Sequence, residues 1–263
     1  MSGADYLKLT DKVYLVTGGT QGLGEAIAGH LADLGAAGIC ICGRNLEAGK
    51  RVARELSARG TLAHFVEADL VRVDDCRRVV EECDEHFGRI DGLVNAAATT
   101  ARGGIEDATP GDFDRMMAVN VRAPFLLMQG CIKIMKREKR GGVVINILSV
   151  VAHGGQPKLT IYSTSKGALL TMTKNVANAV RRDRIRVCGL NIGWMATPGE
   201  DVVQKLEGAP EDWLDAADRA APFGRILRPL DVARLVGFMV SDGGRMATGS
   251  IIDFDQMVIG AFD

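Results

Sequence analysis

The sequence predicts an α/β fold in a single domain, built on one doubly wound parallel sheet. Two patterns support this prediction. Short apolar runs of buried-strand character alternate along the chain with longer segments in which apolar residues recur every three or four positions. Strands that alternate with helices indicate parallel β-α-β units. Because no internal repeat, low-complexity segment or linker divides the chain, we expect residues 1–263 to form one Rossmann-like domain.

The predicted strands are short apolar runs that end in glycine or polar residues. They cover 13–17, 38–42, 63–66, 92–95, 143–148, 186–190 and 251–254. Helical spacing of apolar residues fills the intervals between them. It predicts a helix that Gly35 ends, and further helices over 46–58, 74–87, about 112–135, from Tyr162 onward, and 229–240.

Residues 194–225 break the alternation of strands and helices. The segment holds three prolines, three glycines and two tryptophans, and it is long for a connection in a compact domain. It also follows the carboxyl end of a predicted strand, where open α/β sheets bind their ligands. We therefore expect a substrate lid around 194–225. The alternative is a surface excursion that carries two short helices.

Composition and charge narrow the class of partner. The chain is 47% hydrophobic and 25% charged, which is ordinary for a globular protein. Its net charge of −1 gives no electrostatic reason to expect nucleic acid or an anionic membrane as a partner. No apolar run approaches the roughly 18 residues of a membrane span, and the N-terminus lacks the apolar core of a signal peptide. We expect a cytoplasmic protein.

The six cysteines agree with that location. They form no C-x-x-C pair and no Cys/His cluster with the spacing of zinc ligands. We therefore expect buried, reduced thiols and no metal site.

A glycine-rich turn joins the first predicted strand to the first predicted helix, with glycines at 18, 22 and 24. Glycine permits a tight turn and close backbone approach, and the following helix N-terminus offers free amide donors to a phosphate. Such a turn at the first β-α connection of a doubly wound sheet indicates a dinucleotide site.

The end of the second predicted strand bears on the choice between NAD and NADP. An acidic residue there would bind the ribose 2′-hydroxyl, whereas an arginine would accept a 2′-phosphate. Here the chain reads Gly43-Arg44-Asn45, with a guanidinium and no carboxylate. We therefore favour NADP(H). If Arg44 is only a solvated residue at a strand end, NAD(H) remains possible.

Tyr162 and Lys166 lie four residues apart in a segment whose apolar residues have helical spacing. Residues four apart share one face of a helix, so the phenol and the ammonium are expected within a few Å. A nearby positive charge favours the phenolate and would lower the tyrosine pKa from its usual value of about 10. This pair suits acid–base catalysis on an alcohol or a carbonyl. Taken alone, the pattern is more often a partly exposed helix face.

Together these motifs resemble the short-chain dehydrogenase/reductase family, in its single-domain branch. The resemblance runs from about Lys12 to Asp253, and the family motif T-G-x-x-x-G-x-G appears at 17–24. It implies a catalytic set of Asn120, Ser149, Tyr162 and Lys166. It also implies cofactor contacts from Gly18, Thr20, Gln21, Gly22, Leu23, Gly24, Arg44, Asp69, Leu70, Asn95, Ala96, Tyr162, Lys166, Gly193 and Thr197.

The resemblance also implies roles for the catalytic residues. Tyr162 would donate a proton to a carbonyl while hydride arrives from the cofactor, or remove it from an alcohol in reverse. Ser149 would stabilise the charge that develops on the substrate oxygen. Lys166 would lower the Tyr162 pKa and reach the nicotinamide ribose. Asn120 would hold a water that links Lys166 to solvent.

Three positions depart from the family pattern. Ala98 replaces the final glycine of N-N-A-G, and Ile192 replaces the proline of the P-G motif after the sixth strand, near the expected nicotinamide wall. The sequence at 253–256 replaces a D-G-G turn. In many relatives the C-terminal strand lies at a subunit interface. We therefore expect Phe254 and Phe262 at an interface, and a homotetramer.

The substrate is expected to be a small molecule. The wall of its pocket would come from the lid and from Val150, Val151, His153, Gln156 and Trp194. Hydrogen-bonding side chains at His153, Gln156 and the acidic lid positions favour a sugar, polyol or small hydroxy compound. The expected reaction interconverts a secondary alcohol and a ketone.

Other functions stay open. A 3-oxoacyl-thioester reductase would use a basic surface to dock its carrier protein, and Arg122, Arg181, Arg182 and Arg184 are candidates. A dinucleotide-binding sensor without turnover is an alternative of another class, although such a sensor would not need the complete Asn-Ser-Tyr-Lys set. A sugar epimerase or dehydratase ranks below both.

Overall fold

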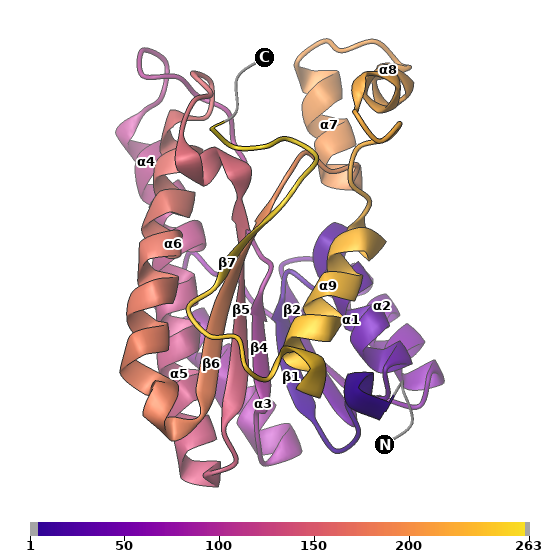
Figure 1. The fold of residues 1–263 in the computed structure, drawn as a ribbon, viewed down its shortest axis with the longest axis vertical. Helices are drawn as coiled ribbons and strands as arrows, with labels where there is room; N and C mark the ends of the chain where they lie inside the picture. Colours follow the sequence, from indigo (N-terminus) through magenta and orange to yellow (C-terminus); the bar gives the residue numbers. More distant parts are fainter. Residues whose placement is uncertain (1–4, 261–263) are drawn as a thin grey trace.

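The computed structural model describes residues 5–260, which contain one seven-stranded parallel sheet of order β3-β2-β1-β4-β5-β6-β7 (Figure 1). This arrangement confirms the predicted fold class, and each predicted strand agrees with an observed one to within two residues. The strands are β1 Val13–Thr17, β2 Gly38–Gly43, β3 Leu62–Glu67, β4 Gly92–Asn95, β5 Gly142–Ser149, β6 Ile185–Ile192 and β7 Ile251–Phe254.

Helices cover both faces of the sheet. One face carries α1 Gly22–Asp33, α2 Leu46–Ala58 and α9 Pro229–Val240, and the other carries α3 Val73–Phe87, α5 Ala123–Glu138 and α6 Thr160–Val180. The remaining helices are α4 Pro110–Met117, α7 Pro198–Leu206 and α8 Trp213–Ala220, with a π-helical turn at Ala118–Arg122 and 3₁₀ turns at Asp5–Leu7, Val150–His153, Arg181–Asp183 and Asp242–Gly244. Among the described residues, no helix is both long and apolar enough to cross a bilayer.

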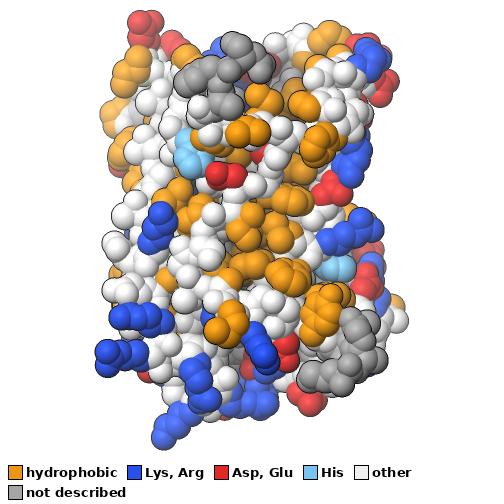
Figure 2. Space-filling view, in the orientation of Figure 1, with side chains coloured by type: hydrophobic (Ala, Val, Ile, Leu, Met, Phe, Trp, Pro, Cys, Tyr) orange, Lys and Arg blue, Asp and Glu red, His pale blue; other side chains and the backbone are white. Residues whose placement is uncertain are grey.

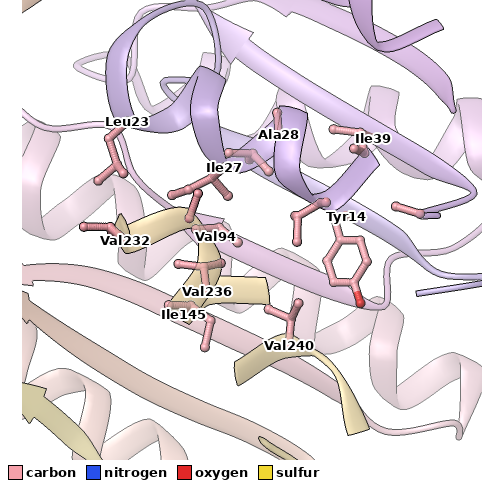
Figure 3. Close-up of a cluster of buried hydrophobic side chains, with 14 of the residues drawn as sticks. Tyr14, Leu23, Ile27, Ala28, Ile39, Val94, Ile145, Val232, Val236 and Val240 are labelled. Atoms are coloured by element: carbon pink, nitrogen blue, oxygen red, sulfur yellow. The ribbon is translucent and has the colours of Figure 1, made fainter. Parts of the chain in front are cut away.

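Strand β1 shows why the central strands are mostly apolar. Val13 and Leu15 pack into the cluster beneath α3, α5 and α6, while Tyr14 and Val16 pack into the cluster beneath α1 and α9. Successive side chains of a strand point to opposite faces, so a strand that is buried on both faces has few positions for polar side chains. Figure 3 shows the second of these clusters, in which Tyr14 lies among aliphatic side chains of both helices.

The six cysteines are all free and buried, as predicted. Burial raises the pKa of the Cys42 and Cys131 thiols well above their ordinary value, so both stay protonated and unreactive at neutral pH.

The long helical region expected over about 112–135 is present, but it is not α-helical throughout. The chain forms α4, the π-helical turn and then α5, with Ala123 N–H donating to the Ala118 carbonyl five residues earlier. Pro124 explains the break. Proline has no N–H, so the Asn120 carbonyl loses the donor that an α-helix would place four residues later.

The segment 194–225 contains α7 and α8, the two short helices of the alternative reading. They lie above the carboxyl end of the sheet, beyond β6 (Figure 1). Trp213, Ala217 and Ile226 form a small hydrophobic cluster of their own, separate from the two clusters that flank the sheet. The segment is therefore a folded unit at the place where a lid would have to be. Its movement stays a prediction.

The packing of α1 against α9 yields a stability prediction. Ile27 is fully buried between the helix and the sheet, so Ile27→Ala should lower the free energy of unfolding by about 2–5 kcal/mol. Urea denaturation followed by circular dichroism measures this change. Ile105→Ala is the matched control, because Ile105 is 85% exposed and should change the value by less than about 0.5 kcal/mol. Equal effects of the two substitutions would contradict the described packing.

Candidate active site

A cavity of about 910 Å³ opens at the carboxyl ends of the strands. It brings together residues that are far apart in the sequence, from the glycine-rich turn after β1 to helix α7 after β6. Of the predicted site residues, those that line it are Gly18, Thr20, Gln21, Gly22, Leu23, Gly24, Arg44, Asp69, Leu70, Ala96, Ser149, Tyr162, Lys166, Gly193 and Thr197. Asn95 and Asn120 lie behind the wall, where both are buried.

The glycine-rich turn has the conformation and spacing that a phosphate requires. Gly18 and Gly22 have φ of 67° and 56°, in the left-handed region that favours glycine. A Cβ at Gly24 would lie 2.3 Å from the Gly18 carbonyl oxygen, so only glycine lets the start of α1 approach the turn. The N-cap residue of α1, Gln21, makes no capping hydrogen bond through its side chain. The first amides of α1 are thus available to a diphosphate, and the turn fits a dinucleotide.

Thr17 holds this turn against the neighbouring strand end. Its Oγ1 accepts hydrogen bonds from Ala96 N–H at 3.1 Å and Ala97 N–H at 3.0 Å. The loop after β4 therefore lies directly beside Gly18. Thr17 is the first residue of the family motif, but the motif alone assigns it no role. A hydroxyl at the last position of an otherwise apolar strand is the signal that marks it.

Asn95 contributes to a buried polar chain rather than to the cavity wall. Its Nδ2 donates to Asn146 Oδ1 at 2.8 Å, and Asn146 Nδ2 donates to Thr173 Oγ1 at 2.9 Å. The chain links β4, β5 and α6 beneath the site. The Oδ1 atom of Asn95 is buried without a hydrogen-bond partner among the described residues. Direct contact of Asn95 with a cofactor stays a prediction.

The two residues predicted to contact the adenosine half lie at neighbouring strand ends. Arg44 follows β2, is exposed and lines the cavity. The next residue, Asn45, caps α2 by accepting a hydrogen bond from Ala48 N–H. Asp69 follows β3, and its Oδ1 accepts from Val71 N–H at 3.1 Å, which fixes the turn. Arg44 therefore lines the cavity with no carboxylate beside it at the end of β2.

Tyr162, Lys166 and Ser149 meet at the opposite end of the cavity. Lys166 Nζ lies 5.6 Å from the centroid of the Tyr162 ring and donates to the Ile147 carbonyl at 2.8 Å. Ser149 makes a hydrogen bond with Tyr162 that favours the phenolate. The predicted proximity of the phenol, the ammonium and the hydroxyl is thus present in the structure.

The direction of the Tyr162 pKa differs from the sequence-based expectation. The Tyr162 pKa is raised to about 12, mainly by burial and to a smaller extent by the Glu200 charge, while the Ser149 hydrogen bond opposes the rise. Burial also lowers the pKa of Lys166 to about 8. The expectation of a lowered pKa failed because desolvation of the phenol dominates the Tyr162 pKa, while the Lys166 ammonium donates its hydrogen bond to the Ile147 carbonyl. At neutral pH the phenol is protonated, which is the form that donates a proton to a carbonyl.

Asn120 lies behind the cavity wall and is linked to Tyr162 through buried hydrogen bonds. Its side chain donates to the Thr99 carbonyl and to Ser165 Oγ and accepts from Thr99 N–H, all within 3.0 Å. Ser165 Oγ in turn donates to the Tyr162 carbonyl at 2.7 Å. Ser165, which the sequence analysis overlooked, therefore connects Asn120 to the backbone of Tyr162. The sequence alone does not single out Ser165, because a serine within the Y-x-x-x-K segment looks like an ordinary residue on an exposed helix face.

The expected substrate end of the cavity has a mixed apolar and polar lining, and it differs from the prediction at one residue. Val150, Val151, Gln156, Trp194 and the lid helix α7 line it as expected. His153 does not. Its Nε2 lies 3.0 Å from Asp253 Oδ1, and the residue lines a second, smaller cavity beside β7. The 3₁₀ turn at Val150–His153 places the histidine away from Ser149, which the spacing of the two residues in the sequence does not reveal.

The substitutions at Ile192 and Ala98 are accommodated. Without the proline, β6 continues through Ile192 and pairs it with Phe254 of β7. Gly193 then lies so close to Asp255 that a Cβ would be 2.1 Å from its carboxylate oxygen. Both Ile192 and Ala98 remain on the cavity wall.

Known proteins resemble this chain over most of its length. The short chain dehydrogenase family matches residues 12–207. An uncharacterized oxidoreductase of Thermotoga maritima is 34% identical over 93% of this chain and 96% of its own. The NADP-dependent (R)-specific alcohol dehydrogenase of Lentilactobacillus kefiri is 31% identical over 92% of this chain and 94% of its own.

A solved structure shows the same architecture. The blue fluorescent protein from a metagenomic library, in complex with NADPH, superposes with a TM-score of 0.84 at 30% identity, and the match covers 95% of this chain and 98% of that one. Sequence, fold and the order of the motifs lead to one conclusion. The chain belongs to the short-chain dehydrogenase/reductase family of oxidoreductases.

Proposed function

We propose that the protein interconverts a secondary alcohol and a ketone on a sugar, polyol or small hydroxy compound, with NADP(H) as cofactor. One observation carries the proposal. The Tyr162 phenol, the Ser149 hydroxyl and the Lys166 ammonium converge on one end of the cavity whose other end is the glycine-rich turn. A site that only bound a dinucleotide would not need this convergence, which disfavours the sensor.

Tyr162 is the general acid in the reductive direction. Its raised pKa keeps the phenol protonated, so it can give its proton to the carbonyl oxygen as negative charge develops there. Ser149 donates a hydrogen bond to the same oxygen and stabilises that charge. The chemistry that a nicotinamide supplies here is hydride transfer.

Lys166 and Asn120 support the acid. With one donor on the Ile147 carbonyl, the ammonium of Lys166 has further donors for a ribose hydroxyl on the cavity side. The side chain of Asn120 makes hydrogen bonds with Thr99 and Ser165. The proposed water would therefore bind the backbone carbonyl of Asn120, which lacks its usual helical donor because residue 124 is a proline. Proton supply to Lys166 along this route is part of the proposal.

Arg44 and the relatives support NADP(H) over NAD(H). The guanidinium borders the adenosine end of the cavity, where it would meet a 2′-phosphate. One relative is NADP-dependent, and one structural neighbour was solved with NADPH. NAD(H) remains the alternative cofactor.

Gln156 and Glu200 on the cavity wall support a hydroxylated substrate. The alternative of a 3-oxoacyl thioester finds less support, because Arg122 donates to the Val71 carbonyl and Arg184 to the Lys139 carbonyl. These guanidiniums are therefore engaged by local backbone rather than free for a carrier protein. We propose further that 194–225 moves as a substrate lid. The cytoplasmic location stays a prediction.

We also propose a homotetramer. Figure 2 shows apolar side chains gathered on the face that β7 and α9 form. Leu230 and Phe238 of α9 and Met257 and Val258 after β7 are exposed there. Phe254 of β7 is half-buried on the same side, whereas Phe262 lies outside the described residues. A contiguous apolar surface of this kind indicates a protein–protein interface.

Tyr162→Phe tests the acid. It removes the proton donor while keeping the ring, so kcat for carbonyl reduction should fall at least ~100-fold with little change in cofactor affinity. The assay follows NADPH absorbance over a panel of ketoses, aldoses, diketones and acetoacetyl thioesters. In the wild type, kcat/KM should hold below about pH 8 and fall above it, because Lys166, with its pKa of about 8, loses its proton there. Unchanged activity of Tyr162→Phe would refute the assignment.

Arg44→Asp tests the cofactor. The substitution removes the cation and adds a carboxylate, so KM for NADPH should rise ~10–100-fold and preference should move toward NADH. Steady-state kinetics with both cofactors measures the ratio. Arg54→Ala is the control, since Arg54 is an exposed arginine on α2 that does not line the cavity. A wild type that prefers NADH would refute the role of Arg44 and leave the catalytic residues standing.

Phe238→Glu tests the oligomer. A charge on α9 should dissociate an assembly formed through that face, and analytical ultracentrifugation would show a smaller species than for the wild type. Leu62→Glu, on an exposed residue at the opposite edge of the sheet, should leave the mass unchanged. A wild-type monomer at micromolar concentration would exclude the tetramer.

A further inference from the structure

Glu200 lies in the first turn of α7 and lines the same cavity as Tyr162. Thr197 caps this helix by accepting a hydrogen bond from the Glu200 N–H at 3.0 Å. The side chain is only 16% exposed. Glu200 is therefore an inward-facing carboxylate at the substrate end of the cavity, fixed by the helix that carries it.

Three donors hold one oxygen of this carboxylate. Oε1 accepts from Gln204 Nε2 at 2.7 Å, from Trp194 Nε1 at 2.9 Å and from Arg102 at 3.3 Å. Oε2 receives no hydrogen bond from any residue in the described range 5–260. The group is thus oriented through one oxygen, while the second keeps its lone pairs for a donor from another molecule.

The negative charge of Glu200 reaches the reacting end of the cavity. Burial is the main cause of the raised Tyr162 pKa, and the Glu200 charge adds to it. Two cations lie near: Lys166 donates to the Ile147 carbonyl, and Arg102 is shared between Glu200 and Glu207, whose oxygen lies 3.1 Å from its Nε. A substrate carboxylate that approached Oε2 of Glu200 would therefore meet a like charge.

We propose that Glu200 is a specificity-determining residue, which accepts a hydrogen bond from a substrate hydroxyl beside the reacting carbonyl and repels substrates that carry a carboxylate there. The proposal rests on the proposed function and refines it to neutral hydroxyketones and their alcohols. An oxo acid would bring a second carboxylate to a partly dry site, where like charges repel strongly and Oε2 would have no donor. A hydroxyketone supplies that donor.

Because of Arg115, the expected discrimination against anionic substrates applies only to the carbon next to the carbonyl. This arginine also lines the cavity, but it is exposed and lies on α4. An anionic group at the far end of a longer substrate would meet Arg115 rather than Glu200. Discrimination by Glu200 therefore concerns charge close to the reacting carbon and not the net charge of the substrate.

The first test measures the field without any substrate. The chain has only three tyrosines, so the ionisation of Tyr162 can be followed by absorbance or by ¹³C-tyrosine NMR, with Tyr162→Phe as the assignment variant. Tyr14 is buried, and its pKa is raised beyond the range of the titration. Glu200→Gln should move the Tyr162 transition to lower pH. Glu207→Gln, which removes the other partner of Arg102, should leave it in place, and an unmoved transition in Glu200→Gln would overturn the proposal.

The second test compares hydroxyacetone with pyruvate, which differ by a hydroxymethyl and a carboxylate beside the same carbonyl. The wild type should reduce hydroxyacetone with the higher kcat/KM, and Glu200→Gln should lower that preference at least ~10-fold, equivalent to about 1.4 kcal/mol. A wild type that reduces pyruvate as well as hydroxyacetone would overturn the proposal. Failure of the proposed function would look different, since Tyr162→Phe would then keep full activity while the tyrosine titration still reports on Glu200.

Discussion

The site depends on the burial of the parallel sheet on both faces. Inside such a sheet a polar side chain has no water on either side, so hydroxyls and amides concentrate where the strands end. Thr17, Asn95 and Ser149 are the last residues of β1, β4 and β5. Parallel strands all end at the same edge, where Thr17 pairs with Asn95 and Ser149 lies three residues beyond Asn146, the partner of Asn95; the cavity opens at this edge.

Two buried polar links carry this arrangement below the surface. Asn95, Asn146 and Thr173 tie β4 and β5 to α6, and Asn120 with Ser165 ties the π-helical turn to the same helix. The helix that bears Tyr162 and Lys166 is thus fixed to the sheet by hydrogen bonds as well as by apolar packing. Burial of Lys166 opposes folding at neutral pH, because its pKa falls to about 8 and the unfolded chain holds the proton more tightly. The catalytic role proposed for Lys166 would be a sufficient reason to retain such a cost.

The sequence predicts what depends on local pattern. Apolar runs located the strands, and the glycine spacing located the turn at Gly18, because both reflect backbone geometry within a few residues. It did not predict what depends on neighbours in space. The π-helical turn follows from Pro124, the upward pKa shift of Tyr162 follows from burial, and the position of His153 follows from Asp253, 100 residues away. Ser165 was overlooked because only its contact with Asn120 distinguishes it.

The separate hydrophobic cluster of the segment 194–225 has an evolutionary consequence. Trp213, Ala217 and Ile226 hold α8 in place largely among themselves, and Asp201 of α7 accepts a hydrogen bond from the Trp213 indole. Substitutions in these helices can therefore accumulate without disturbing the packing of the sheet or the glycine-rich turn. A lineage with this fold can change what it acts upon by drift in some thirty residues, while the hydride chemistry and its cofactor are inherited intact.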